Sequence, residues 1–123
     1  MKEIVLVFFG GGLGSLTRYS IGLVVERFHI RFLSLPVQTL LSNLLGCFII
    51  GLLIGYLSRC PNNLMRMFAV VGFCGGFTTF SAFSLETVNL IRENAWSAAL
   101  LYIFESIFLC LAGTILGIYF MKH

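Results

Sequence analysis

Two long stretches of the chain contain no charged residue, and they constrain the fold more than any other feature. No Asp, Glu, Lys or Arg occurs from Phe32 to Ser58, and none occurs from Met67 to Leu85. A helix needs about 20 residues to cross the roughly 30 Å hydrocarbon core of a bilayer. Each stretch is long enough for such a crossing, so the sequence predicts a protein that spans a membrane.

The composition leaves too little polar surface for a soluble domain. Hydrophobic residues make up 59% of the 123 residues and charged residues only 11%, whereas an average soluble domain has roughly 25% charged residues. The net charge of +3 is small and scattered along the chain, which argues against nucleic acid as a partner. We therefore expect this chain to be surrounded by membrane lipid.

The hydrophobic segments predict an all-α membrane protein with four transmembrane helices in a single domain, residues 1–123. We place the helices at about residues 4–25, 33–57, 66–91 and 96–120. Pro36 enters the second helix, and the loop after it contains Pro61 and the pair Asn62-Asn63, a clear loop signal. Four spans put both termini on the same side of the membrane.

The basic residues outside the apolar segments are divided almost evenly between the two sides. The side of the termini has Lys2, Arg59, Arg66 and Lys122, and the other side has Arg27, Arg31 and Arg92, with Arg18 as a further candidate. An excess of Lys and Arg normally fixes the orientation. Without such an excess, a chain can insert in both orientations. Two copies can then pair as an antiparallel, dual-topology homodimer, in which two chains together form the inverted repeat that many transporters carry in one chain. The alternative is that loop charges are sparse and another feature fixes one orientation.

Small residues recur where helices would have to approach closely. Four short helices do not easily enclose a polar pathway alone, which also favours a homodimer. In lipid, helix association depends on packing, and glycine allows backbones to touch. The glycines expected to do so are Gly10, Gly11, Gly12, Gly14, Gly46, Gly51 and Gly55.

The third predicted helix carries its own interruption. Gly75-Gly76 followed by Thr78-Thr79 makes a poor continuous helix, because Gly favours breaks and Thr loses rotamer freedom. A break within the membrane is tolerated where the freed backbone groups are buried in protein or line a site. Carbonyls at the end of the first half-helix suit a cation, and two crossing chains would cage one small ion. Close packing through the glycines is an equally weighted alternative.

Aromatic rings and hydroxyls follow this break. Phe80 and Phe83 are three residues apart and share a helix face, while Thr79, Ser81 and Ser84 surround them. Phe in a membrane helix usually contacts lipid or packs internally. The positive edge of an aromatic ring also attracts an anion without trapping it, which suits conduction.

Further polar residues lie within the other spans. Asn43 sits in the charge-free second helix and needs a hydrogen-bond partner, either in another helix or in a pore. A stripe at every fourth position of the last helix consists of Tyr102, Ser106, Cys110 and Thr114. Its hydroxyls can solvate an anion, although Ser and Thr also bond back to their own helix. Charges within the spans are functional candidates, and they are Arg18, Glu86 and Glu105.

The four cysteines show no metal-binding spacing, so we expect structural roles for Cys47, Cys60, Cys74 and Cys110.

The chain resembles the Fluc (CrcB) family of bacterial fluoride channels over nearly its whole length. The resemblance lies in GGLGSLTRY at 11–19, NLLGCFIIG at 43–51 and GFCGGFTTFSAFS at 72–84.

The resemblance implies a passive, fluoride-selective channel of the bacterial inner (plasma) membrane that confers fluoride resistance. It implies an antiparallel homodimer with two pores and a central Na⁺ held by the backbone carbonyls of Gly75 and Thr78. Phe80, Phe83 and Asn43 match the family's pore residues, and Glu86 matches a pore-lining glutamate. The polar track of the fourth helix corresponds to Tyr102, Ser106 and Thr114, with Cys110 where a hydroxyl is expected.

A small multidrug-type exporter is the strongest rival, because such exporters are also four-helix, dual-topology dimers. That class resembles proton-coupled pumps with a carboxylate in the middle of the first helix, and no acidic residue lies between Glu3 and Glu26 here. An enzyme is not expected, because Gly10-x-Gly12-x-x-Ser15 lacks the third glycine of a dinucleotide-binding turn and no βαβ pattern follows.

Overall fold

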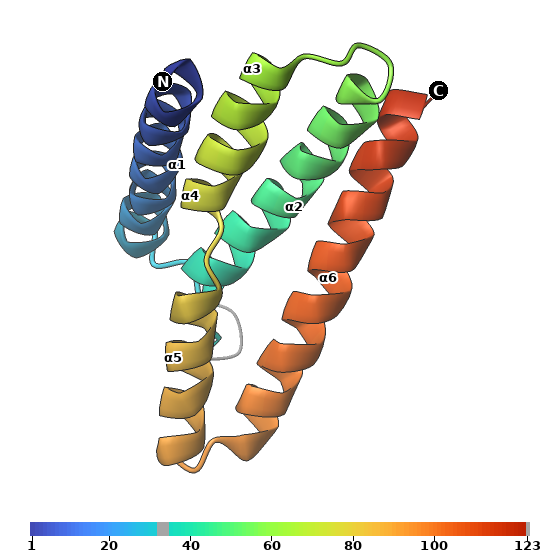
Figure 1. Ribbon diagram of the computed structural model, residues 1–123. Helices are drawn as coiled ribbons and strands as arrows, with labels where there is room; N and C mark the ends of the chain where they lie inside the picture. Colours follow the sequence, from blue (N-terminus) through green and yellow to red (C-terminus); the bar gives the residue numbers. More distant parts are fainter. Residues whose placement is uncertain (32–34, 123) are drawn as a thin grey trace.

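The computed structural model describes residues 1–31 and 35–122, and this part of the chain is helical (Figure 1). Its elements are α1 (Lys2–Arg27), α2 (Val37–Leu57), α3 (Asn63–Met65), the π-helical segment η1 (Arg66–Cys74), α4 (Gly75–Phe77), α5 (Phe80–Arg92) and α6 (Trp96–Lys122). The spans long and apolar enough to cross a membrane are Lys2–Arg27, Val37–Leu57, Asn63–Arg92 and Trp96–Lys122. The prediction of an all-α protein with four spans is confirmed, and the chain is a multi-pass membrane protein.

The helices differ from the expected bounds at their ends. Residues 33 and 34, where the second helix was expected to begin, lie outside the described residues, and α2 begins at Val37 directly after Pro36. The third span begins at Asn63 instead of residue 66, because the Asn62 side chain accepts a hydrogen bond from the Met65 N–H at 3.0 Å. This bond satisfies one of the free donors of a helix start and fixes where the span begins.

The two termini lie at the same end of the molecule, as the even number of spans requires (Figure 1). At the opposite end, α5 and α6 are joined by a tight turn in which Asn94 has a φ of 57°. Asn is one of the few residues that adopt this left-handed conformation readily. The Ala95 N–H then bonds the Leu90 carbonyl at 2.9 Å and closes the turn.

Helix α1 and the first half of the third span are held together by glycines on both sides of their contact. A Cβ built on Gly10 would lie 2.2 Å from the Phe68 carbonyl oxygen, and one on Gly14 would lie 2.2 Å from that of Phe73. From the other side, a Cβ on Gly76 would lie 2.3 Å from the Gly11 carbonyl oxygen. The expected close approach is therefore confirmed for this pair, and backbone packs directly on backbone.

A second glycine contact joins α2 to α6. A Cβ on Gly51 would lie 2.3 Å from the Thr114 carbonyl oxygen, and one on Gly117 would lie 2.4 Å from that of Phe48. Gly12 was expected to take part in close packing and does not, because no atom lies within 4 Å of a Cβ built there. It faces outward on α1, one residue away from the contact side.

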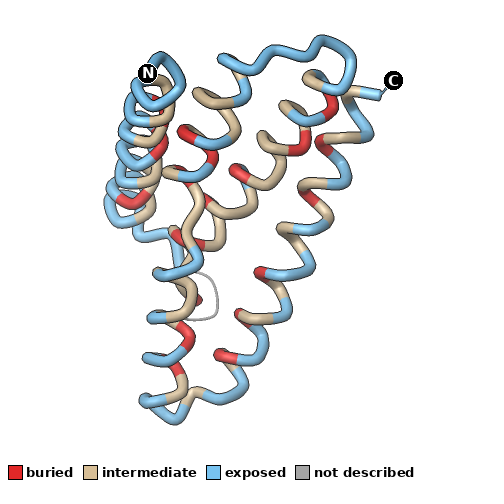
Figure 2. Tube along the Cα trace, viewed as in Figure 1, coloured by how far each residue is buried: buried red, intermediate tan, exposed pale blue. Residues whose placement is uncertain are grey.

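Few residues of the single chain are buried, and exposed residues occur along every span (Figure 2). Many of the exposed residues are large and apolar. One apolar cluster is buried at the α5–α6 end and consists of Leu35, Leu90, Ala99 and Tyr102. Exposed apolar side chains are expected of a surface that faces lipid or another transmembrane chain. The polar side chains described next lie instead around the break in the third span.

Candidate functional site

The third span is broken between α4 and α5, at the position that the sequence predicts (Figure 1). Thr78 (φ −88°, ψ 156°) and Thr79 (φ −150°, ψ 126°) are extended, and helical geometry resumes at Phe80. The Thr79 hydroxyl oxygen accepts a hydrogen bond from the Ala82 N–H at 3.2 Å and so caps α5. The break is therefore a structured element with a capped helix on its far side.

Asn43 on α2 holds the break through both the NH2 and the C=O of its side-chain amide. Its Nδ2 donates to the Thr79 carbonyl oxygen at 3.0 Å, and its Oδ1 accepts from the Thr79 N–H at 2.8 Å. This two-point contact pairs the side-chain amide with an exposed peptide unit much as a neighbouring strand would. Of the two interpretations left open for Asn43, the interhelical bond is present, and one amide hydrogen remains for another acceptor.

The same contact frees two backbone carbonyls. In a continuous helix, the Thr79 N–H would bond the Gly75 carbonyl and the Ala82 N–H would bond the Thr78 carbonyl. Here these donors are bound to Asn43 and to the Thr79 hydroxyl. Hard cations prefer oxygen ligands, so the freed carbonyls of Gly75 and Thr78 fit the Na⁺ expected from the sequence. Among residues 1–31 and 35–122, no group of three or more His, Cys, Asp or Glu side chains could hold a metal ion.

The two glycines of the break have different surroundings. Gly76 is in backbone contact with α1, as described above. Gly75 is exposed, and a Cβ built on it would have no atom within 4 Å. Close packing, the alternative to an ion site, therefore accounts for Gly76 but not for Gly75.

Three aromatic rings form a row from the break toward α6. The ring centroids of Phe80 and Phe83 are 5.5 Å apart, and those of Phe83 and Tyr102 are 5.2 Å apart, both pairs being tilted. Phe80 is 78% exposed, whereas Tyr102 is fully buried. The row thus begins on the surface of the chain and ends in its interior.

Glu86 lies beyond the row and accepts two short hydrogen bonds. The Thr39 hydroxyl donates to its Oε1 at 2.6 Å, and the Tyr102 hydroxyl donates to its Oε2 at 2.6 Å. Thr39 and Tyr102 are both buried. Thr39 was not among the expected site residues, yet it stands four positions before Asn43, on the same face of α2. That spacing is the signal by which the sequence could have revealed it.

Several of these side chains line two hollows. A cavity of about 430 Å³ is lined by Arg18, Gln38, Thr39, Thr79, Ser81, Ala82, Leu85 and Glu86. A second cavity, of about 210 Å³, is lined by Asn43, Cys47, Thr78, Thr79, Phe80 and Cys110. Both share Thr79, so the extended residues of the break lie between them. Arg18 and Glu86, which the sequence analysis identified as charges within the spans, both line the first hollow.

The hydroxyls near the break and on α6 differ in how they are engaged. Thr79 and Ser81 bond each other at 3.0 Å, and the Thr114 hydroxyl donates to the Cys110 carbonyl at 3.1 Å. Thr114 therefore bonds back to its own helix. Ser106 is buried, and its Oγ has no hydrogen-bond partner within the part of the chain that the structure describes. Ser84 is half-buried on α5.

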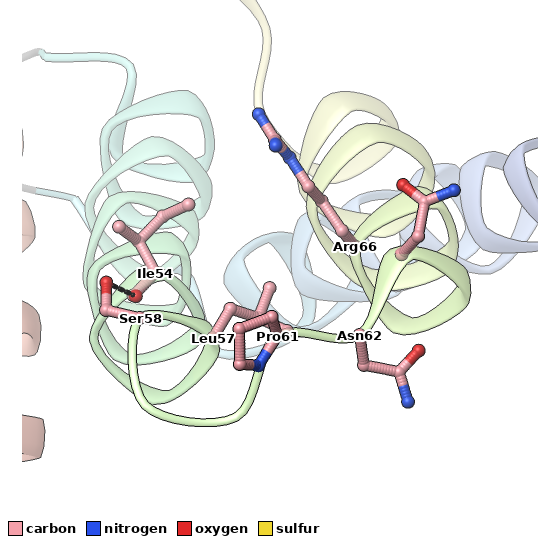
Figure 3. A pocket seen from close by; sticks show the side chains of 7 residues that line it. Ile54, Leu57, Ser58, Pro61, Asn62 and Arg66 are labelled. Carbon is pink, nitrogen blue, oxygen red and sulfur yellow. Dashed lines mark hydrogen bonds between the residues drawn. The ribbon is translucent and has the colours of Figure 1, made fainter.

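Two other hollows lie apart from the break. Glu105, which we could not place from the sequence, lines one of about 360 Å³ with Phe104, Phe108 and Leu109. Figure 3 shows the other, of about 350 Å³, where α2 ends and the third span begins. There the Ser58 hydroxyl donates to the Ile54 carbonyl at 2.7 Å, and Arg66 supplies a positive charge.

Comparison with known proteins shows the family of this chain. The model of the family described as CrcB-like protein, Camphor Resistance (CrcB), matches residues 5–118. A protein of Azobacteroides pseudotrichonymphae named fluoride-specific ion channel FluC is 44% identical over 95% of this chain and 94% of its own length. Relatives of the same name in Flavobacterium psychrophilum and Gloeothece citriformis are 40% and 42% identical over 100% of this chain and 99% of their own lengths. This chain belongs to the CrcB family.

Proposed function

We propose that this protein is a passive, fluoride-selective channel through which F⁻ leaves the bacterial cytoplasm across the plasma (inner) membrane. The observation that carries the proposal is the broken third span, which Asn43 clamps beside two phenylalanine rings and two hollows that polar side chains help to line. The relatives named as fluoride-specific ion channels support fluoride as the ion. The protein acts as a transporter and not as an enzyme.

The channel is an antiparallel, dual-topology homodimer in this proposal. The nearly even distribution of basic residues supports it, as does the surface of the single chain around the break. Phe80 and Gly75 are exposed there, and Phe80 also lines the smaller of the two hollows. A second copy packed on this surface would close the pathway, which one chain leaves open to its surroundings.

The pathway runs from the hollow of Arg18 toward the break and then along α6. Arg18 attracts anions, while Glu86 is held by Thr39 and Tyr102 beside the row of rings. Fluoride is small and accepts strong hydrogen bonds, so its dehydration needs close donors. The donors are the second amide hydrogen of Asn43 and the Ser106 hydroxyl, which has no partner among the described residues. The ring edges of Phe80 and Phe83 supplement them. The remaining hydroxyls of the pathway belong to Thr79, Ser81, Ser84, Tyr102 and Thr114.

Selectivity follows from the same groups. A narrow pathway with fixed donors replaces the hydration of F⁻ and disfavours the larger chloride, while neutral contacts keep binding weak enough for release. The carbonyls of Gly75 and Thr78 from two chains would hold one Na⁺, which supplies a fixed positive charge at the dimer centre. The driving force is the electrochemical gradient of F⁻, which accumulates when HF enters from acid surroundings and ionises in the cytoplasm.

The small multidrug-type exporter is not favoured. Helix α1 has no carboxylate between Glu3 and Glu26 with which to exchange protons. The relatives reported above carry the name of a channel.

The test is ion efflux from liposomes that contain the purified protein and are loaded with potassium fluoride or potassium chloride. Valinomycin is added so that K⁺ leaves with the anion. We expect rapid fluoride efflux, no chloride efflux and no requirement for a proton gradient. Folded, dimeric protein that released no fluoride would rule out the channel, and proton-driven export of organic cations would then be measured.

A further inference from the structure

Two thiols meet inside the proposed pathway. Cys47 on α2 and Cys110 on α6 are both half-buried. Both line the 210 Å³ cavity that also contains Asn43, Thr79 and Phe80. They are therefore a pair that shares one cavity, and not two separate small hydrophobic residues as the sequence suggested.

The backbones of α2 and α6 hold this pair in place. One turn further along both helices, a Cβ on Gly51 would lie 2.3 Å from the Thr114 carbonyl oxygen. A Cβ on Gly113 would lie 3.4 Å from the Leu44 carbonyl oxygen, close to Cys47 on the same helix. Helices in such direct contact cannot move apart without losing it, so the fold sets how far apart the backbones that carry the two thiols lie.

The chemistry of the cavity selects the kind of ion. Thiolate sulfur is a soft ligand and prefers soft cations. The cavity contains no carboxylate or imidazole, and no cluster of three ligating side chains exists in the two described ranges. A tetrahedral ion such as Zn²⁺ would lack ligands here. A cation that is satisfied by two sulfurs in a line, as Hg²⁺ is, needs nothing more.

We propose that Cys47 and Cys110 bind one soft, two-coordinate metal cation and that the bound ion blocks the pathway. With Hg²⁺, two S–H bonds are replaced by two Hg–S bonds, two protons are released to water, and no electron is transferred. The product is neutral, which suits a site within the membrane. Metal–thiolate bonds of about 2.3 Å would place the two sulfurs about 4.6 Å apart on opposite sides of the ion. The blocking step rests on the proposed function, whereas the binding step does not.

Binding is tested with Hg²⁺ and the full chain in detergent. Cys60 is exposed and is first replaced by Ser in every variant, because a free surface thiol binds the same ion. We expect one Hg²⁺ per chain and the Hg–thiolate absorption band. Cys47→Ser and Cys110→Ser should each weaken binding by about 100-fold, since one thiol loses the advantage of a linked pair. Cys74→Ser tests the neighbouring thiol, which lines a separate hollow with Cys47 but not with Cys110, and it should leave binding intact.

Thiol alkylation supplies a measurement that needs no substitution at the site. In the Cys60→Ser chain, Hg²⁺ should protect Cys47 and Cys110 together from alkylation, as read by mass spectrometry. Unequal protection, or Hg²⁺ binding that survives either substitution, would overturn the site. These readouts hold whether or not the liposomes conduct fluoride.

Blocking is then measured as fluoride efflux with and without Hg²⁺, each variant being compared with its own metal-free rate. Efflux through the Cys60→Ser chain should stop, and efflux through the two chains that also lack Cys47 or Cys110 should continue. Stoichiometric binding with unchanged efflux would show that the pair lies off the conducting route and would overturn the blocking step alone.

Discussion

Replacement of Asn43 by Leu is the most direct test of how the break is held. Leu is close to Asn in size, so the substitution removes two hydrogen bonds with little change in packing. It leaves the Thr79 N–H and carbonyl without protein partners. A buried polar group that loses its partner costs about 1–3 kcal/mol. The two unpaired groups should therefore lower the free energy of unfolding by about 2–6 kcal/mol. The lower end applies because Thr79 borders two hollows that water can enter.

Asn43→Asp is the matched control. The carboxylate still accepts from the Thr79 N–H, but its second oxygen replaces a donor that now lies 3.0 Å from the Thr79 carbonyl oxygen and repels that oxygen. We expect a loss of at least about 1–3 kcal/mol from the missing bond, to which the repulsion adds. Both variants should conduct fluoride at least about tenfold more slowly, one because the break is misplaced and the other because a negative charge repels the anion.

Stability is measured as the denaturant dependence of unfolding in detergent, and conduction as fluoride efflux from liposomes. Lower stability of both variants than of the wild type would support the clamp. Equal stability of the wild-type and Leu chains would refute the argument that Asn43 holds the break. Normal efflux through the Leu chain would remove Asn43 from the pathway.

Four further outcomes are expected from other substitutions. Phe80→Ala and Phe83→Ala should both reduce fluoride efflux, and unchanged efflux in both would contradict the aromatic row. Only Phe83→Ala should also destabilise the single chain, because Phe83 packs on Tyr102 whereas Phe80 is 78% exposed. Tyr102→Phe should destabilise the chain by about 1–3 kcal/mol through loss of the Glu86 bond, and calorimetry that found no change would show this bond to be dispensable. Ser106→Ala removes a buried hydroxyl without a described partner, so thermal stability should be unchanged or higher while fluoride efflux falls; normal efflux would place Ser106 off the pathway. Gly10→Ala should disrupt the contact of α1 with the third span, because a Cβ there would lie 2.2 Å from the Phe68 carbonyl oxygen. Gly12→Ala should not, because a Cβ there would contact nothing within 4 Å. Equal folding yields of the two variants would contradict the glycine contact.

The sequence predicted the features that depend on residue type within one segment. Apolar length predicted the spans, and Gly75-Gly76 followed by Thr78-Thr79 predicted the break, since both follow from local backbone preferences. The mutual position of the helices decides the remaining features. Nothing local shows that Thr39 reaches Glu86, because the two residues lie on different spans and meet only after the helices pack.

The glycines illustrate the same limit on a smaller scale. A run such as Gly10, Gly11 and Gly12 looks equally suitable at each position, but a helix turns by about 100° per residue and only one face meets a neighbour. Which face that is depends on the partner helix. Gly10 and Gly14 lie on it and Gly12 does not.

The two glycine contacts also explain why the break can be irregular without disordering the chain. Gly10 and Gly14 fix the first half of the third span on α1, while Gly51 and Gly117 fix α2 on α6. The chain between these contacts is left with few conformations, and one amide side chain is then enough to define Thr78 and Thr79. A backbone held in this way keeps its free carbonyls and its hydroxyls in place before any ion arrives. That preorganisation is what a pathway needs if it is to replace the water around a small anion and still let it go.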